Sequence, residues 1–417
     1  MQVHFVKKSE NVLPLFLIIL YLTFFPVYLY SAKVFWYQGY YNYTGVSFFK
    51  FFLCTLLVVF FTYYGKNIES GFVKVTYYIC LVLLLYGEIV SYVCDNSTNL
   101  IMIIIVSLFL LLIPTTEKIN TDVRLYSSLS QDNKGQIIFL LSIVLFLPFL
   151  RYISQINIGN LLLKDIYETR TLFRNNSSGS SAIGYIKEPL SRVLLPLLLV
   201  IGIERKNKMY IALSSVMILY IFLCGGLKSI MFGLLSVLFF YKGDYSEKLL
   251  RFVKVLSIVC VIGVLLYYFF DYDSIISILR RLFILPARLN KYYVDYFTNN
   301  WTYYRHSGLS LNPNPEYSIG ISNYVGDYVI GNGTNANTGL FVEGYYSFGM
   351  LGGILYLMIP LFIITIFNSI KLDGKFFGIF FVYLYYFNTA ILSTLLLTHG
   401  LLFFIFMAFL CMREEYD

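Results

Sequence analysis

Charged residues are scarce in this chain. They make up 13% of its 417 residues, whereas soluble globular proteins carry about 25%. Hydrophobic residues account for 58%, and tyrosine and phenylalanine occur 39 times each. Aromatic residues of this kind favour membrane interfaces. The composition therefore excludes an ordinary soluble protein and predicts an all-α, polytopic membrane protein.

Cysteine and histidine are also few, with six and three copies. Five of the cysteines fall inside apolar runs, and none forms a C-x-x-C pair. This pattern excludes a disulfide framework and a cysteine metal site, so we expect neither a metal nor a cofactor. The net charge of +8 comes mostly from basic residues in short loops, and no basic and aromatic array indicates nucleic-acid binding.

Long apolar runs are what the sequence does contain. A membrane-spanning helix needs roughly 20 such residues. The first run follows Lys7 and Lys8 as a signal peptide would, but no A-x-A cleavage site follows it, so we expect an uncleaved helix. Twelve spans are predicted, or eleven if the last two form one, at residues 12–31, 46–64, 73–93, 98–114, 136–153, 186–203, 209–224, 227–241, 252–271, 341–367, 376–392 and 396–412.

The distribution of lysine and arginine predicts the orientation. With a cytoplasmic N-terminus, the short outer loops hold only Lys33 and Lys228, and the inner segments hold the other basic residues of the short loops. This asymmetry is typical of membrane insertion and places both termini in the cytoplasm. Two long outer loops, 154–185 and 272–340, escape the charge rule. We expect one integral membrane domain, 1–417, with its function in these loops.

The first long outer loop carries two arginines that are four residues apart. If 161–173 is a surface helix, Arg170 and Arg174 lie on one face, and two guanidinium groups there suit a diphosphate. An interfacial helix that binds lipid headgroups is the alternative.

Two further cations lie close to apolar runs. Arg192 sits just inside a predicted span, where a charge is costly and indicates function, although a local pair with Glu188 explains it as well. Lys228 follows a glycine turn, where it would reach a lipid phosphate or snorkel to the interface.

The second long outer loop interleaves cations with apolar and aromatic residues. Arg281 and Arg288 are seven apart, about two helical turns, with Pro286 between them to kink the path. Trp301 and the loop tyrosines offer flat faces that stack on sugars, or serve as interfacial anchors. His306 is the histidine of this loop, a candidate proton acceptor or an exposed side chain.

A glycine-rich stretch ends the second loop and begins the next span. Its glycines allow close approach of helices or of a lipid. Glu343 lies at the outer end of this span, either as a general base or as an interface residue. Asp271 and Asp273 form an Asp-x-Asp pair, which suits a metal or simply ends a helix.

Three stretches resemble the O-antigen polymerases of the Wzy type. NTGLFVEGYYSFGMLG (337–352) is similar to the Thr-Gly and Phe-Gly-x-x-Gly pattern of that family. RLFILPA (281–287), with Asn290 and two tyrosines after it, looks like the Arg-x-Phe and Pro-Ala segment. CGGLKS (224–229) falls where the family usually has Gly-x-Arg-Ser, and Lys228 departs from that arginine.

The resemblance, which covers about the C-terminal half, implies a GT-C-like fold in a bacterial inner membrane. It implies polymerisation of undecaprenyl-diphosphate-linked oligosaccharide repeat units into O-antigen, capsule or exopolysaccharide, alongside a flippase and a chain-length regulator. A transition state of that kind needs cations at the diphosphate and a base at the acceptor hydroxyl. We assign Glu343 as base with His306 in reserve, and the diphosphate to Arg170, Arg174, Arg192, Arg281, Arg288 and Lys228.

Three other functions share this layout. A lipid-linked oligosaccharide flippase would usually show related halves, and no internal repeat is visible. A ligase that transfers glycan to another acceptor would favour a firmly held loop histidine. A membrane scaffold without chemistry is the third.

Overall fold

The chain is described by a computed structural model that covers residues 2–36, 43, 45–95, 100–119, 131–162, 166–177, 181–226, 228–307, 310–331, 333 and 335–413. Within these residues the protein is all-α, and the extended structure consists of two isolated bridges, Tyr43 with Asp95 and Leu372 with Arg413. Helices are the structure that long apolar runs adopt in a membrane, because each helix satisfies its own backbone hydrogen bonds.

Seven helices of the described chain are long and apolar enough to cross a membrane. They confirm the all-α membrane class and coincide with seven of the predicted spans, and the total of eleven or twelve stays a prediction. Three shorter apolar helices, Ile101–Glu117, Ile230–Phe240 and Leu401–Cys411, fall on other predicted spans. The seven are Val12–Val34, Phe48–Asn67, Gly71–Cys94, Asn133–Gln155, Lys208–Gly225, Tyr245–Phe270 and Leu340–Ser369.

Internal contacts divide the chain into two compact units. The first unit comprises Met1–Asn120, Asp244–Asn368 and Leu384–Leu392. The second comprises Thr121–Gly243, Ser369–Tyr383 and Ser393–Asp417.

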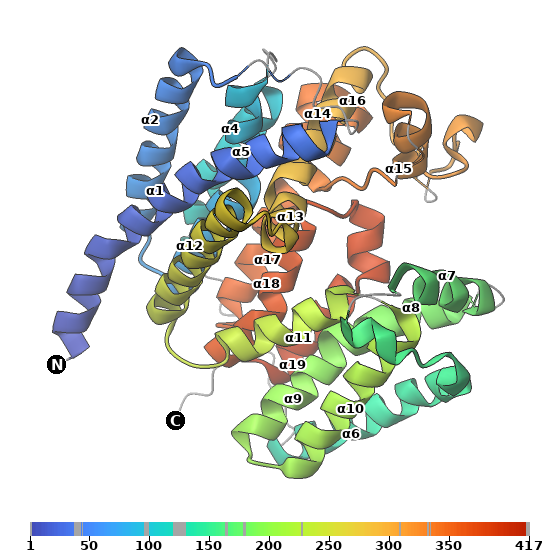
Figure 1. Cartoon of the computed structure of the whole chain (residues 1–417). Coiled ribbons are helices and arrows are strands. Elements are labelled where there is room, and N and C mark those ends of the chain that lie inside the picture. Colours follow the sequence, from blue (N-terminus) through green and yellow to red (C-terminus); the bar gives the residue numbers. More distant parts are fainter. Residues whose placement is uncertain are drawn as a thin grey trace. The chain divides into compact units, whose positions relative to one another are not determined.

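The first unit is built on two long helices that pack along each other, α1 and α12 (Figure 1). The span Gly71–Cys94 is almost wholly buried, and it consists of α3, the π-helical turn η4 and α4. The elements are α1 (Gln2–Val34), α2 (Phe48–Tyr64), η3 (Gly65–Asn67), α3 (Gly71–Cys80), η4 (Leu81–Leu85), α4 (Tyr86–Cys94), α5 (Ile101–Leu112), η5 (Ile113–Glu117), α12 (Tyr245–Phe270), α13 (Ser274–Leu279), η9 (Arg280–Ile284), α14 (Leu285–Phe297), η10 (Pro315–Tyr317), α15 (Ile321–Tyr324), η11 (Val325–Ile330), α16 (Leu340–Tyr356) and most of α17 (Met358–Ser369).

The second unit packs α9 closely against α10. Asn207 begins α10, because its side chain accepts hydrogen bonds from the first free backbone N–H groups of the helix. The elements are α6 (Gln131–Phe146), η6 (Leu147–Gln155), η7 (Ile158–Leu162), α7 (Ile166–Ser177), α8 (Ser181–Pro189), η8 (Leu190–Leu194), α9 (Leu195–Glu204), α10 (Lys208–Gly225), α11 (Lys228–Phe240), η12 (Gly374–Phe376), most of α18 (Phe377–Tyr386), η13 (Thr394–Thr398) and α19 (Leu401–Cys411).

The two stretches expected as long outer loops contain helices of their own. In 154–185 we expected a surface helix at 161–173. The structure has the helix α7 there, at Ile166–Ser177, four to five residues later in the sequence. In 272–340 the cation-bearing start folds as α13, η9 and α14.

A π-helical turn precedes a proline in each unit. In the second unit η8 runs into Leu195-Pro196, and in the first unit η9 runs into Leu285-Pro286. The N–H of Leu195 bonds Leu190 O and that of Leu285 bonds Arg280 O, five residues back in both cases. A proline lacks the N–H that a regular helix would use at its position, and the wider turn accommodates it. Such turns are often found at functional sites.

Candidate functional site

The helix α16 is broken at Phe348 and Gly349. Their backbone angles leave the helical region, with φ −142° and ψ 23° at Phe348 and φ 65° and ψ −153° at Gly349. The carbonyls of Tyr346 and Ser347 therefore lose their partners four residues on. They accept instead from the N–H groups of Thr302 (2.8 Å) and Tyr303 (2.9 Å).

Glycine is required at this break for two reasons. Its positive φ is disfavoured for other residues, and a Cβ at Gly349 would lie 2.6 Å from the ring of Trp301. The break at Phe348 and Gly349 thus frees the two backbone carbonyls to which residues 302 and 303 bond.

The docked segment brings His306 against Glu343, so the two candidate catalytic residues meet. His306 Nε2 lies 3.4 Å from Glu343 Oε1, and Thr302 Oγ1 lies 3.0 Å from His306 Nδ1. Glu343 Oε2 accepts a hydrogen bond of 2.5 Å from the N–H of Leu392. The imidazole is therefore held between a hydroxyl and a carboxylate, as a proton-transferring histidine would be.

Both side chains of this pair are enclosed, with exposed fractions of 0%. The ring of Tyr346 covers His306 edge-on, with 4.7 Å between ring centres. A sugar hydroxyl would reach the pair only after the 301–307 segment moves. In the present arrangement the pair also fixes that segment to α16.

A cluster of cations surrounds Asp95 at the end of α4. Arg288 Nη1 forms an ion pair with Asp95 Oδ2, and Lys291 Nζ lies 2.9 Å from the same oxygen. The hydroxyl of Tyr28 donates to Asp95 Oδ1. Lys50 Nζ donates to the backbone oxygen of Asp95 at 3.0 Å. These five residues form the Asp95 cluster.

The Asp95 cluster has an excess of positive charge. Arg288 and Lys291 face the carboxylate of Asp95 and Lys50 faces its backbone oxygen, and Arg288 is only 2% exposed while Lys291 is 16% exposed. Removing an ion from water costs several kcal/mol, so three cations gathered around one aspartate are suited to an anionic ligand. Arg288 was a candidate from the sequence, whereas Asp95, Lys50 and Lys291 were not.

Two of the three family-like stretches meet next to this cluster. Asn290 donates to Glu88 Oε1 at 2.6 Å and accepts from the hydroxyl of Thr338 at 2.8 Å. Gly339 follows Thr338, and a Cβ on it would lie 2.3 Å from the carbonyl of Phe387. In the Thr-Gly pair, the threonine therefore forms a hydrogen bond to Asn290, and the glycine allows close contact with the backbone of Phe387.

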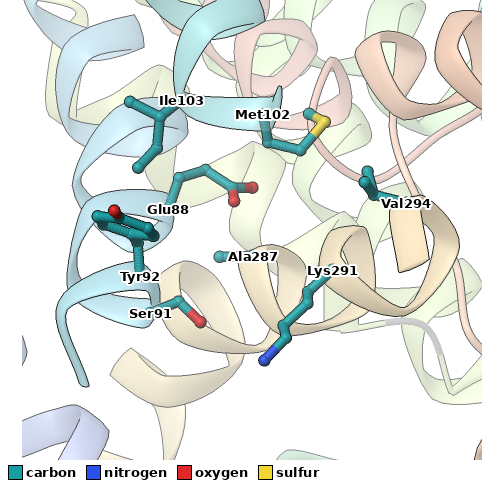
Figure 2. A pocket seen from close by; sticks show the side chains of 8 residues that line it. All are labelled: Glu88, Ser91, Tyr92, Met102, Ile103, Ala287, Lys291 and Val294. Atoms are coloured by element: carbon teal, nitrogen blue, oxygen red, sulfur yellow. The ribbon is translucent and has the colours of Figure 1, made fainter. Parts of the chain in front are cut away.

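Glu88 faces a small cavity between α4, α5 and α14 (Figure 2). The cavity measures ≈ 30 Å³, which is room for about one or two water molecules. Lys291 of α14 lines it as well, so it adjoins the Asp95 cluster. Glu88 was missed in the sequence, although an acid inside an apolar run is a functional signal.

Arg281 and Arg288 do not lie on the same side of their helix. Arg281 is exposed, Arg288 is buried, and Arg280 is buried with its guanidinium 3.7 Å from the centre of the Phe35 ring. Arg281 lies within the π-helical turn η9, and Arg288 lies in α14, which follows it. The extra residue of η9 shifts the register, so a spacing of seven no longer returns to the same face.

The second unit has a cation cluster of similar composition. Arg192 Nε lies 2.6 Å from Glu188 Oε2, which is the local pair that the sequence allowed. Lys187 Nζ lies 3.6 Å from Glu188 Oε1, and Arg170 is close enough to Lys187 for their charges to interact. Arg192 and Glu188 are buried, and Arg170 is exposed. These four residues form the Glu188 cluster.

For the remaining candidate residues, the structure shows the helix or the contact of some of them only. Arg174 lies in α7 and Lys228 begins α11, and their side chains lie outside the described residues. The glycine turn before Lys228 packs on α7, because a Cβ on Gly226 would be 2.5 Å from the carbonyl of Ile166. Asp273 accepts a hydrogen bond of 3.1 Å from Tyr30, and the described residues contain no group of three or more possible metal ligands.

Comparisons of the chain with protein-family models, with curated proteins and with solved structures found no match. A proposal for the function is therefore founded on the residues and contacts above, together with the resemblance in the three sequence stretches.

Proposed function

We propose that the protein polymerises oligosaccharide repeat units carried on undecaprenyl diphosphate. The observation that carries this proposal is the pair of cation clusters, one in each unit, each built around a buried carboxylate. Polymerisation joins two substrates that both bear a lipid diphosphate, so it needs two anion sites. In each cluster two cations contact the carboxylate and a third lies beside them.

In the first unit the Asp95 cluster is suited to the leaving diphosphate. Arg288 offers a planar fork of donors, which matches phosphate oxygens. Lys291 and Lys50 add mobile point charges. Preorganised cations of this kind stabilise the charge that builds on the diphosphate as the glycosidic bond breaks.

In the second unit the Glu188 cluster is suited to the other lipid diphosphate. Arg192 lies in η8 and Lys187 at the end of α8. Arg170 extends the positive charge to the exposed face of α7. Arg174 and Lys228 belong to the helices beside it, so we include them in this proposed site.

The proposed chemistry is direct displacement at a sugar carbon. A hydroxyl of one repeat unit attacks the anomeric carbon of the growing chain, and the bond from that carbon to the diphosphate oxygen breaks. The hydroxyl proton passes to the pair His306 and Glu343. The diphosphate leaves as an anion and stays on its lipid.

The cellular setting is part of the proposal. We place the chain in a bacterial inner membrane with a GT-C-like fold, both termini in the cytoplasm and the reaction at the outer face. A flippase would supply the lipid-linked units, and a chain-length regulator would act beside the polymerase. The product is an O-antigen, a capsule or an exopolysaccharide.

A ligase that transfers glycan to another acceptor is the second candidate. The contacts of His306 favour it, because a loop histidine held by Thr302 and Glu343 is the feature expected of that reaction. Both reactions release lipid diphosphate, so they share the cation sites and differ in the acceptor.

Deletion of the gene in its native host separates these functions. We expect the ladder of surface glycan on a gel to collapse to the core plus one repeat unit, and the intact gene to restore it. If the gene encodes a ligase, its deletion would instead leave long glycan on the lipid carrier and none on the core. Loss of all units with precursor trapped inside indicates a flippase, and an unchanged ladder contradicts all three.

A further inference from the structure

An apolar groove runs beside the Asp95 cluster in the first unit. Its lining residues come from α2, α4 and α5, and α4 contacts both of the other helices. Its volume is ≈ 430 Å³, more than ten times that of the cavity at Glu88. Its lining is almost wholly aliphatic and aromatic, with Lys50 as the charged residue.

The groove is about as long as half of the hydrocarbon core of a bilayer. On α2 its lining runs from Phe49 to Leu57, and on α5 from Leu100 to Leu111. At 1.5 Å per residue these stretches measure about 12 Å and about 16 Å. Half of the hydrocarbon core of a bilayer is about 15 Å. A hydrocarbon chain would thus extend in the groove from the interface to the middle of the membrane.

The charged end of the groove joins the Asp95 cluster. Lys50 lies in the first turn of α2 and donates to the backbone oxygens of Tyr92 (3.3 Å) and Asp95 (3.0 Å). Tyr92 and Ile103 line both the groove and the small cavity that Lys291 and Glu88 share. One end of the groove therefore carries Lys50 and adjoins the cavity that Lys291 lines, and the rest of the groove is apolar.

We propose that this groove holds the isoprenoid chain of a substrate's carrier lipid, with the diphosphate at Lys50 and Lys291. This proposal is based on the proposed function, because it names the carrier lipid as the occupant. The charge of the cluster favours that lipid over a membrane phospholipid. The three cations that contact Asp95 match a diphosphate better than a phosphodiester, which has a single negative charge.

Photo-crosslinking from two leucines of α2 tests the proposal. Leu53 lines the groove and Leu56 does not, while their exposed fractions are similar at 49% and 52%. A photoreactive residue is placed at either position, and the full-length protein is incorporated into phosphatidylethanolamine vesicles with radiolabelled undecaprenyl diphosphate. We expect several-fold more label at 53 than at 56. Ile104, a groove residue on α5 that is 43% exposed, serves as a second position if the Leu53 variant does not fold.

The cations provide the second arm of the test. Lys50→Gln and Lys291→Gln should each weaken labelling at position 53 by about tenfold, since a hydrogen bond to a charged group contributes at least that much. Equal labelling at 53 and 56 would overturn the proposal. Labelling at position 53 that is unchanged in both lysine variants would also overturn it. So would the loss of that labelling when phosphatidylglycerol is present in excess.

The same vesicles separate this proposal from the proposed function. When they receive lipid-linked repeat units, polymer formation without preferential label at 53 refutes the groove and leaves the polymerase intact. Preferential label without polymer supports the groove and refutes the polymerase.

Discussion

Replacement of Arg288 with glutamine is expected to lower the rate of polymerisation by about two to three orders of magnitude. Arg288 is buried and ion-paired with Asp95, and it is the arginine of the Asp95 cluster. Without it the leaving diphosphate loses its planar fork of donors. The measurement is the rate at which purified protein in vesicles consumes lipid-linked repeat units.

The matched control for Arg288 is Arg281, seven residues earlier in the same segment. Arg281 is exposed, and we expect Arg281→Gln to change the rate only a few-fold.

Loss of one partner from a buried ion pair, as in Arg288→Gln, also destabilises the fold by about 3–5 kcal/mol. Lys291→Gln, at a position that is 16% exposed, therefore tests the same site with less risk to folding. Well-folded Arg288→Gln and Lys291→Gln proteins with wild-type rates would rule out the Asp95 cluster as the diphosphate site.

Replacement of Glu343 with glutamine is expected to slow the chemical step by about two to four orders of magnitude. The amide keeps the shape of the side chain and its oxygen still accepts the hydrogen bond from Leu392. What it removes is the negative charge beside His306. The expected signature is a lower kcat with a nearly unchanged KM, and an altered dependence of kcat on pH.

Glu88→Gln is the comparison that shows which carboxylate acts as base. Glu88 faces a cavity beside Lys291, whereas Glu343 is enclosed. If Glu343 is the base, Glu88→Gln retains the pH profile of the wild type. Loss of activity in Glu88→Gln, with Glu343→Gln active, would transfer the role of base to Glu88.

The sequence was sufficient for the features that depend on local pattern. Apolar runs predicted the seven long helices, because a run of that length in a membrane has to satisfy its own backbone. Arg192 was recognised from its place inside an apolar run. The same rule applied to the span 73–93 indicates Glu88, an acid inside an apolar run that lies outside the two long outer loops.

Pairings over long distances in the chain could not be predicted. Asp95 is a lone acid at the end of a span, and its partner Arg288 is 193 residues away, so no local signal connects them. The register of Arg281 and Arg288 depends on η9, and no sequence pattern marks this π-helical turn beyond the proline after it. The glycines of α16 indicated close packing, and the structure adds that Gly349 breaks the helix.

The most direct test of polymerisation is the mass of the glycan formed by the purified protein alone. Vesicles would contain the protein and an undecaprenyl-diphosphate-linked repeat unit as the only sugar. The account predicts a series of longer glycans on the carrier, with one undecaprenyl diphosphate released for each new linkage. Repeat units that stay single in the presence of well-folded protein would contradict it.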